Sequence, residues 1–320
     1  MQSNENHRDD KVAIILSTYN GAKYIAAQLD SILRQTHTNW KCYIRDDGSK
    51  DETLAILASY FARDTRFAFV DAISGNMGLN SSHYYLISIT TENYVAMCDQ
   101  DDIWDDNKLE VTLHKLKQIE TAKKIPALVH TNSVVVDSNL NIMREQFIGR
   151  RGFKKGLNGI VFANSAQGGS ILINASLRQI AMQVPPVLPY DYHLAIIANL
   201  TGTRAFIPQT LLKYRQHAAS SIAIADSNLP NQLNKSGYST SLLLSLNNYR
   251  HMKQDFKNVA VTKQAESDLC DYFYLFEGKN RFKKLLIYAK NRYPFYARKD
   301  SLAFVSILFK NTDLKTLIST

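Results

Sequence analysis

The sequence predicts an α/β protein: a doubly wound, mostly parallel sheet over residues 11–225, followed by a basic helical region over residues 226–320. Short β-rich runs alternate with helical patterns as far as residue 123, an order typical of doubly wound sheets. The first run, Val12 to Ser17, is apolar along its length instead of at every second position, which is typical of a parallel strand covered on both faces. The polar stretch 216–228 marks the expected boundary between the two regions.

The first part of the chain contains four predicted strands and four predicted helices. Ser49 is the candidate N-cap of the second helix, and Asp105 or Asp106 that of the fourth, because their side-chain oxygens can accept backbone N–H groups. Leu109, Leu113, Leu116 and Ile119 share one face of the fourth helix. The strands are predicted over 12–17, 40–45, 66–71 and 94–98, and the helices over 22–34, 50–61, 79–90 and 105–123.

Residues 126–215 have a mixed pattern, and the chain reads as helical from about residue 228. Gly168 to Ser170 leaves two interpretations open: a place where a backbone approaches a ligand, or a strand bulge. Strands are predicted over 127–136 and 170–174, and helices over 175–183 and 190–199.

Composition limits the class of protein. The 320 residues are 45% hydrophobic, enough for one large core with an appendage. The three cysteines form no C-x-x-C pair, so we expect neither a disulfide framework nor a zinc site, and a reducing, cytoplasmic location. Residues 1–11 are polar and resemble no signal peptide, and no run of 18 apolar residues is present.

The net charge of +9 is concentrated near the C-terminus. Residues 279–299 hold eight Lys and Arg and no acid. Basic residues interleaved with aromatics fit an anionic membrane surface, such as the inner face of the plasma membrane. A solvated basic face and a helical subdomain packed on the core are the alternatives. No nucleic-acid motif accompanies the charge, so nucleic acid is not an expected partner.

Two acidic clusters follow predicted strands. Asp46-Asp47-Gly48-Ser49 follows the second strand, and Asp99-Gln100-Asp101-Asp102 follows the fourth. Ligands bind outside the carboxyl ends of the strands in an open parallel sheet, so we expect both clusters at one edge. The first cluster taken alone is also ordinary turn chemistry.

The second cluster predicts a metal–diphosphate site. Three carboxylates within four residues repel one another unless a cation or a donor network offsets their charge. Oxygen ligands suit Mg²⁺ or Mn²⁺, which commonly join one or two carboxylates to substrate phosphates. The sequence contains neither a G-x-G-x-x-G dinucleotide motif nor a P-loop.

Six motifs in order resemble glycosyltransferase family 2, which has the GT-A fold. Their order across residues 11–220 makes the resemblance specific, and the form of the fourth is close to a bacterial rhamnosyltransferase-like subgroup. The motifs are Ser-Thr-Tyr-Asn-Gly (17–21), Arg-Asp-Asp-Gly-Ser-Lys-Asp-Glu-Thr (45–53), Gly-Asn-Met-Gly-Leu-Asn (75–80), Cys-Asp-Gln-Asp-Asp-Ile-Trp (98–104), Tyr-Asp-Tyr-His-Leu-Ala (190–195) and Tyr-Arg-Gln-His (214–217).

The resemblance implies roles for individual residues. Asp191 matches the catalytic base, although Tyr190 and Tyr192 replace the His and Trp that flank it in the subgroup. The D-x-D pair is Asp99 and Asp101, with Asp101 the more direct metal ligand, and His217 matches a residue near the metal or the diphosphate. The residues implied for nucleotide-sugar binding are Thr18, Tyr19, Asn20, Asp46, Asp47, Asn76, Gly78, Asp99 and Arg215.

The implied reaction is an inverting, metal-dependent hexosyl transfer. A nucleotide-diphosphate sugar, by resemblance a rhamnose donor, would give its sugar to a hydroxyl of a glycan or lipid-linked oligosaccharide during synthesis of a cell-surface or extracellular polysaccharide. Mg²⁺ or Mn²⁺ would stabilise the leaving diphosphate, and a carboxylate would take the proton of the acceptor. The alternatives are a sugar-phosphate nucleotidyltransferase and a non-catalytic nucleotide-sugar or glycan-binding protein of the same fold.

Overall fold

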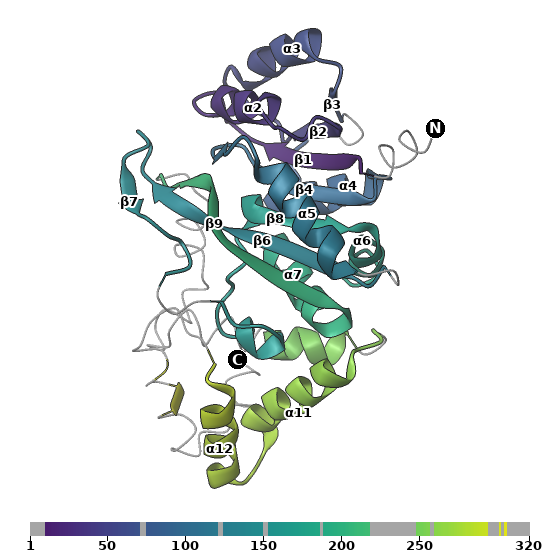
Figure 1. Cartoon of the computed structure of the whole chain (residues 1–320), viewed down its shortest axis with the longest axis vertical. Helices are drawn as coiled ribbons and strands as arrows, with labels where there is room; N and C mark the ends of the chain where they lie inside the picture. Colours follow the sequence, from purple (N-terminus) through teal and green to yellow (C-terminus); the bar gives the residue numbers. More distant parts are fainter. Residues whose placement is uncertain are drawn as a thin grey trace. The chain divides into compact units, whose positions relative to one another are not determined.

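The chain folds into two compact units, which we call the sheet unit and the helical unit (Figure 1). The sheet unit comprises residues 1–149, 166–198 and 203–216, and the helical unit residues 150–165, 199–202 and 217–320. The predicted boundary at 225/226 lies outside the described residues and stays a prediction. The computed structural model describes residues 10–70, 75–120, 124–149, 153–185, 188–217, 248–256, 259–293, 301 and 304–305.

One sheet runs through the sheet unit in the order β3-β2-β1-β4-β8-β6-β9-β5, and β7 pairs with β6. β3, β2, β1 and β4 are parallel neighbours, β8 runs antiparallel to both β4 and β6, and β9 is parallel to β6. The predicted α/β fold is therefore confirmed. The strands are β1 (Val12–Thr18), β2 (Trp40–Asp46), β3 (Phe67–Phe69), β4 (Tyr94–Asp99), β5 (Ile103–Trp104), β6 (Ala127–Val136), β7 (Ile142–Arg144), β8 (Ile171–Asn174) and β9 (Thr203–Arg215).

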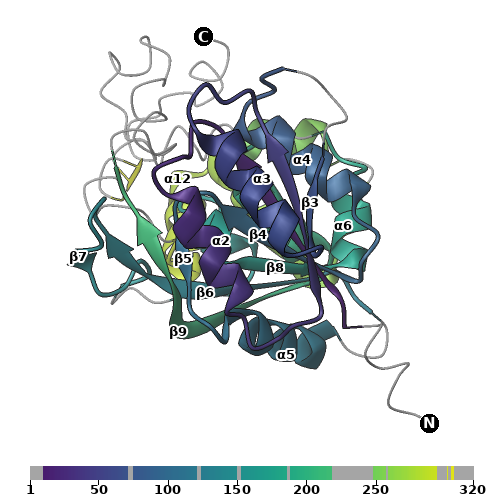
Figure 2. The ribbon, with the colours of Figure 1, turned by 90° about the horizontal axis from the view of Figure 1, so that it is seen from above.

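The apolar patterns explain the core. All seven residues of β1 are buried, as expected for a central parallel strand. Helix α5 buries Leu109, Leu113 and Leu116, whereas Ile119 is only partly buried against the core. In Figure 2, α5 lies on one side of the strands and α4 and α6 on the other. The helices of this unit are α2 (Ile25–Leu33), α3 (Thr53–Arg63), α4 (Leu79–Ile89), α5 (Lys108–Glu120) and α6 (Ala175–Ala181). Helix α7 (Tyr190–Thr201) begins in this unit, and its residues from 199 onward belong to the helical unit.

The structure differs from the sequence prediction mainly at β9, which no pattern indicated. This 13-residue strand contains Pro208, which cannot donate to a ladder and therefore weakens a strand prediction. The register against β6 shifts there, because Thr131 pairs with Ile207 and Asn132 with Thr210. Two residues of β9 are thus left out of the ladder, which accommodates the proline in a bulge.

The predicted N-cap of the second helix is wrong. Helix α3 begins at Thr53 with Glu52 as its N-cap, and the Glu52 side chain makes no capping hydrogen bond. The Ser49 hydroxyl instead accepts the Asn20 amide at 2.8 Å and donates to Asp46, so it stabilises a turn. Sequence could not decide this, because Ser serves both turns and caps.

The helical unit confirms the predicted helical C-terminal region. Side chains cap the two helices α11 and α12 of the described part of this unit: Thr262 accepts the Ala265 amide and Asn280 accepts the Lys283 amide. Phe162 packs edge-on against an aromatic neighbour on α11, Tyr272. No helix among the described residues combines the length and apolar character needed to cross a bilayer. The elements are η1 (Leu157–Gly159), α11 (Lys263–Glu277) and α12 (Arg281–Asn291).

Candidate functional site

Three neighbouring parallel strands end at the same edge of the sheet. β1 lies between β2 and β4, with Thr18 in register with Asp46 and Ser17 in register with Asp99. Neighbouring strands lie about 4.8 Å apart, so the ends of β2 and β4 are separated by about 10 Å. The prediction that both acidic clusters reach one edge is confirmed.

The loop after β1 is held by Gln100, which the sequence analysis did not single out. Gln100 Oε1 accepts the Thr18 hydroxyl at 2.6 Å and the Tyr19 amide at 3.0 Å, while Gln100 Nε2 donates to the Tyr19 carbonyl at 3.2 Å. A Cβ on Gly21 would lie 2.3 Å from Gln100 Oε1, so this contact depends on glycine. The Tyr19 side chain stays 47% exposed and is available to a ligand.

Asn20 and Asp46 stabilise the turns on either side of this loop. Asn20 has a left-handed backbone (φ 47°), and its side-chain oxygen accepts the Lys50 amide at 2.8 Å. Asp46 Oδ2 accepts the amides of Gly48 and Ser49 at 3.0 and 2.8 Å. The contacts of Asp46 are therefore those of a turn residue, and its implied contact to a nucleotide stays a prediction.

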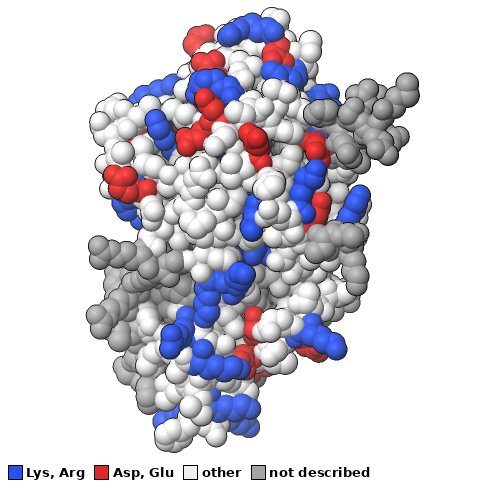
Figure 3. Space-filling model, in the orientation of Figure 1, with Lys and Arg blue, Asp and Glu red and all other residues white. Residues whose placement is uncertain are grey.

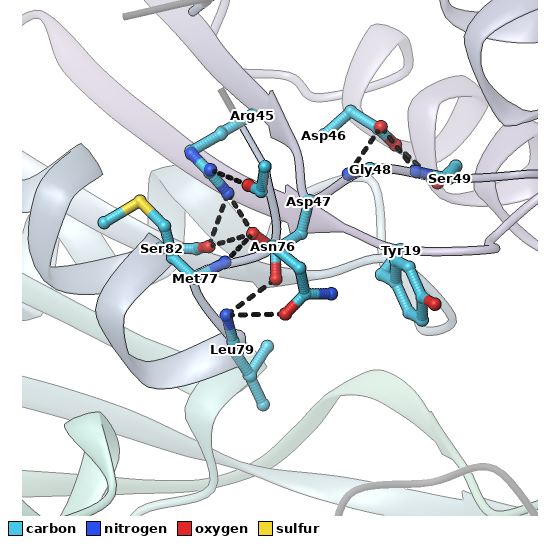
Figure 4. A network of polar contacts seen from close by, with 12 residues as sticks. Tyr19, Arg45, Asp46, Asp47, Gly48, Ser49, Asn76, Met77, Leu79 and Ser82 are labelled. Atoms are coloured by element: carbon cyan, nitrogen blue, oxygen red, sulfur yellow. Dashed lines mark hydrogen bonds and ion pairs between the residues drawn. The ribbon is translucent and has the colours of Figure 1, made fainter. Parts of the chain in front are cut away.

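Asp47 is the centre of a buried polar network (Figure 4). Only 3% exposed, its carboxylate pairs with the Arg45 guanidinium and accepts the Met77 amide at 2.7 Å and the Gly78 amide at 2.8 Å. The Ser82 hydroxyl donates to it at 3.3 Å. Burial would raise the pKa of Asp47, but the hydrogen bonds from Met77, Arg45 and Gly78 outweigh burial and lower it.

The network fixes the loop that leads into α4. Gly78 has φ 80° and is the N-cap of α4, and the Asn76 side chain accepts its amide at 3.1 Å. Arg45 Nη2 donates to the Gly75 carbonyl at 2.8 Å. Asp47 thus positions the loop that carries Asn76 and Gly78, and its implied contact to a nucleoside stays a prediction.

Asp99 at the end of β4 is held by two donors. The Tyr190 hydroxyl donates to Oδ1 at 2.9 Å, and the Gly169 amide donates to Oδ2 at 3.0 Å. Gly169 belongs to the short turn η2 (Gly168–Ser170) ahead of β8. Beta-carbons on Gly168 and Gly169 would lie 1.9 Å from Tyr190 Oη and 2.7 Å from Asp102 Oδ2. Glycine at these positions therefore leaves room for the acids and the phenol, and the approach of a ligand to this backbone stays a prediction.

His83 completes this cluster from α4, and the sequence analysis missed it. Its ring stacks on the Tyr190 ring with centroids 3.9 Å apart and planes 5° from parallel. His83 Nε2 lies 4.0 Å from Asp99 Oδ1. Burial lowers the pKa of His83 more than the Asp99 charge raises it, so the imidazole is neutral at pH 7. A lone His inside a helical pattern carries no signal that would have identified it.

Asp102 points into the protein interior. It accepts the Arg215 amide at 3.1 Å and Gln167 Nε2 at 3.3 Å. Burial and the charges of Asp101 and Asp99 raise the pKa of Asp102 well above its usual range. Lys108 is also fully buried nearby, and burial lowers its pKa to about 8 despite the neighbouring acids. A network of donors therefore offsets part of the repulsion within the cluster.

Arg215 holds the acidic turn in place. Its Nε donates to the Asp101 carbonyl at 2.7 Å, its Nη1 donates to the Ser138 carbonyl at 2.8 Å, and its guanidinium lies 4.6 Å from the Tyr24 ring centroid. The side chain is 4% exposed. These contacts favour a positioning role over the implied contact to the nucleotide sugar.

The acidic turn fits a cation that shares its ligands with a substrate. No set of three or more His, Cys, Asp or Glu forms a ready metal cage within the described residues. Asp101 is half-buried at the turn, and Asp99 is 23% exposed. Mg²⁺ and its analogues commonly take one or two carboxylates together with waters and phosphate oxygens, which suits this partial set. His217, half-buried two residues after β9, belongs to the helical unit, and its metal role stays a prediction.

Asp191 lies in the first turn of α7, directly after Tyr190. Burial raises the pKa of Asp191 to about 7, the Tyr192 amide at 2.7 Å opposes this rise, and the Asp99 charge adds to it. A carboxylate whose pKa is close to the working pH is suited to general-base chemistry. The Tyr190–Asp99 hydrogen bond connects this helix to the strand-end acids.

Comparison with known proteins agrees with this geometry. Residues 13–172 match the family model described as glycosyl transferase family 2. The chain belongs to glycosyl transferase family 2. The match ends before Asp191 and Arg215, so their roles depend on the contacts described above.

Two solved structures share the fold. TarS 1–349 of S. aureus in complex with UDP-GlcNAc aligns with a TM-score of 0.55 at 14% identity, over 97% of this chain and 92% of that chain. The mannosyltransferase PcManGT from Pyrobaculum calidifontis in complex with GDP-Man and Mn²⁺ aligns with a TM-score of 0.50 at 15% identity, over 96% and 83%. The predicted GT-A type of fold is confirmed.

Sequence relatives match shorter stretches. WfgD of Escherichia coli, named UDP-Glc:alpha-D-GlcNAc-diphosphoundecaprenol beta-1,3-glucosyltransferase, is 30% identical over 105 residues, which are 33% of this chain and 40% of that protein. The chain spans between 15% and 59% of the length of the first curated relatives that it matches.

Proposed function

We propose that the protein is an inverting glycosyltransferase that moves a hexose from a nucleotide-diphosphate sugar to an acceptor hydroxyl. One observation carries this proposal: the strand-end acids of β4 are joined to Asp191 on α7 through the Tyr190–Asp99 hydrogen bond of 2.9 Å. This contact supports a single site for the acids that suit a diphosphate and the carboxylate that suits a base.

The donor side of the site uses the loops after β1 and β2. Tyr19 offers an exposed aromatic ring, and Asn76 and Gly78 lie on the loop that Asp47 fixes. Asp101, together with Asp99, would hold Mg²⁺ or Mn²⁺, which supplies a Lewis acid for the leaving nucleoside diphosphate. Arg215 keeps the Asp101 backbone in position for this task.

The acceptor side depends on Asp191. An acceptor hydroxyl is a weak nucleophile, so a carboxylate must take its proton as the new bond forms. The pKa of about 7 leaves a large share of Asp191 ionised at neutral pH while keeping it basic enough for that proton transfer. In a single displacement the nucleophile enters opposite the leaving group, which inverts the anomeric centre.

The finer chemistry is proposed from relatives and motifs. The names of the proteins described above include UDP-GlcNAc, GDP-Man with Mn²⁺, and transfer to a diphosphoundecaprenol-linked sugar. We accordingly propose a divalent cation and a lipid-linked oligosaccharide or other glycan acceptor for this chain. Rhamnose as the donor sugar, and a cytoplasmic location at the inner face of the plasma membrane, remain predictions from the sequence.

The reaction products test this proposal. The full chain is incubated with Mn²⁺, a panel of UDP-, GDP- and dTDP-sugars and glycan acceptors, and the released nucleotide is separated by chromatography. We expect nucleoside diphosphate, an inverted glycoside and loss of turnover with chelator. Pyrophosphate release would favour a nucleotidyltransferase, and binding without release of either product would favour a non-catalytic binding protein; each result contradicts the proposal.

A further inference from the structure

Helix α12 in the helical unit exposes large apolar side chains on the face opposite to its buried residues. Ile287 and Asn291 are buried, with the Asn291 amide bonded to Asp271 on α11 at 3.1 Å. Phe282 and Leu286 are 80% and 71% exposed. Residues four apart lie on the same face of a helix, so these two form one apolar ridge that is directed away from the packed side.

Basic side chains flank this ridge. Residues 279–293 hold six Lys and Arg and no acid. At 100° per residue, Lys283 and Lys290 follow the Phe282–Leu286 ridge on one side, and Lys283 Nζ lies 4.3 Å from the centroid of the Tyr274 ring on α11. Arg281 lies about 120° from the ridge in the other direction. Lys290 is 69% exposed although it pairs with Asp271, and Figure 3 shows Lys and Arg together with some Asp and Glu over the region where Figure 1 draws α11 and α12.

The packing of the helical unit orients this face of α12 but does not require the exposed side chains on it. Asn280 caps the start of α12, and the buried amide of Asn158 donates to Asn291 Oδ1 at 3.1 Å near its end. Phe282 and Leu286 therefore contribute little burial to the packing of the unit. Large exposed apolar residues rimmed by charge mark interaction surfaces.

We propose that this face of α12 binds an anionic lipid surface, with Phe282 and Leu286 inserted at the level of the headgroups. An interfacial helix combines an apolar ridge with Lys and Arg that reach the headgroup phosphates. The six Lys and Arg of residues 279–293, of which Lys290 is paired with Asp271, supply the charge complementarity. Such binding would bring the protein to a surface that carries a lipid-linked acceptor, but it does not depend on the proposed reaction.

A vesicle-binding assay tests this proposal with the full chain. Flotation is compared on vesicles of phosphatidylcholine alone and of phosphatidylcholine mixed with phosphatidylglycerol, at low salt and at about 0.5 M NaCl. We expect binding to the mixed vesicles at low salt and at least a tenfold loss in Phe282→Ser/Leu286→Ser. Replacement of Lys283 and Lys290 by Gln should weaken binding about fivefold per charge and reduce its salt dependence.

Matched variants serve as controls. Leu54→Ser/Met143→Ser removes two side chains of the sheet unit that are 47% and 56% exposed, and it should bind vesicles like the native chain. No binding by the native chain, or native-like binding by Phe282→Ser/Leu286→Ser, would overturn the proposal. The proposal would also be overturned if Phe282→Ser/Leu286→Ser lost vesicle binding and, without lipid, sedimented at a smaller mass than the native chain. The Phe282–Leu286 ridge would then join copies of the chain. The vesicle assay contains no nucleotide sugar, so its outcome does not depend on whether the proposed glycosyl transfer takes place.

Discussion

The hydroxyl of Tyr190 donates a 2.9 Å hydrogen bond to Oδ1 of Asp99. This contact joins the first residue of α7 to the last residue of β4, 91 positions apart in sequence. Tyr190 also stacks on His83, so its ring is fixed on one face while its hydroxyl orients the acid. Tyr190, the residue next to the proposed base Asp191, therefore also orients Asp99, one of the acids proposed to hold the diphosphate through a cation.

Tyr190→Phe tests this link. The ring and its stacking on His83 remain, while Asp99 loses one of its two donors, so we expect affinity for Mn²⁺ with nucleoside diphosphate to fall about threefold to tenfold and stability to fall by about 1–2 kcal/mol. Calorimetric titration and thermal unfolding measure the two effects. Tyr43→Phe is the control, because its hydroxyl donates to Glu92 at 2.9 Å away from the acids. It should lose stability without losing affinity; equal loss of affinity in both variants would contradict the link.

Asp191→Asn tests the base. With the pKa of Asp191 at about 7, the native kcat/KM should rise as pH increases through 7 and level off above it, since the base must be ionised. The variant should keep donor binding and lose transfer by at least 1000-fold. A pH–rate profile with no inflection between about 6 and 8 would show that another group takes the proton.

The same pKa predicts an effect of Asp191→Asn on stability. Because the folded-state pKa of Asp191 lies above its unfolded value, ionisation costs stability as pH rises from about 4 through 7. Replacement by Asn removes that cost, so the variant should melt a few degrees higher than the native chain at pH 8. Near pH 4, where the native carboxyl is protonated in the folded state, the difference should disappear. A variant that melts lower at pH 8 would contradict the assignment.

Gly169→Ala tests the close approach at the acids. Its Cβ would lie 2.7 Å from Asp102 Oδ2 and 3.2 Å from Asp99 Oδ2, and Asp102 is already held by Arg215. We expect a loss of about 1–3 kcal/mol in unfolding free energy and a large loss of turnover. Gly149→Ala is the control, because nothing lies within 4 Å of its added carbon. Unchanged stability in Gly169→Ala would mean that η2 tolerates a side chain.

Asp47→Asn tests the network below α4. The substitution removes the negative charge that neutralises the buried Arg45 guanidinium, so unfolding free energy should fall by about 3–5 kcal/mol at pH 7. Since the pKa of Asp47 is lowered on folding, the contribution of its carboxylate is present above pH ~4 and is lost as pH falls through the lowered value. Asp64→Asn, which breaks the more exposed pair with Arg66, should cost about 1 kcal/mol or less. Chemical denaturation measures both losses of unfolding free energy, and equal losses in Asp47→Asn and Asp64→Asn would contradict the buried network.

Much of the fold and the location of the site could be predicted because they depend on local pattern. The buried run of β1 and the apolar face of α5 follow from periodicity, and parallel strands necessarily bring Asp46 and Asp99 to one edge. β9 could not be predicted, because Pro208 interrupts its pattern and its pairing with β6 is made at long range.

The partners of the individual acids could not be predicted from sequence. Repulsion within Asp99 to Asp102 indicated a cation or a donor network, and the structure provides the network for Asp102 through Arg215. Asp47 and Arg215 were assigned to the ligand because motif position does not reveal which side chains the fold already satisfies. His83 was missed because its importance comes from stacking on a residue more than 100 positions away.

The most direct test of the account is calorimetric titration of Mn²⁺ with nucleoside diphosphate into three proteins: the native chain, Asp101→Asn and Asp191→Asn. We predict that Asp101→Asn loses the binding that depends on the cation, whereas Asp191→Asn binds like the native chain and fails only in transfer. Native-like binding by Asp101→Asn, with or without chelator, would contradict the claim that the acids at the end of β4 hold the diphosphate through a cation.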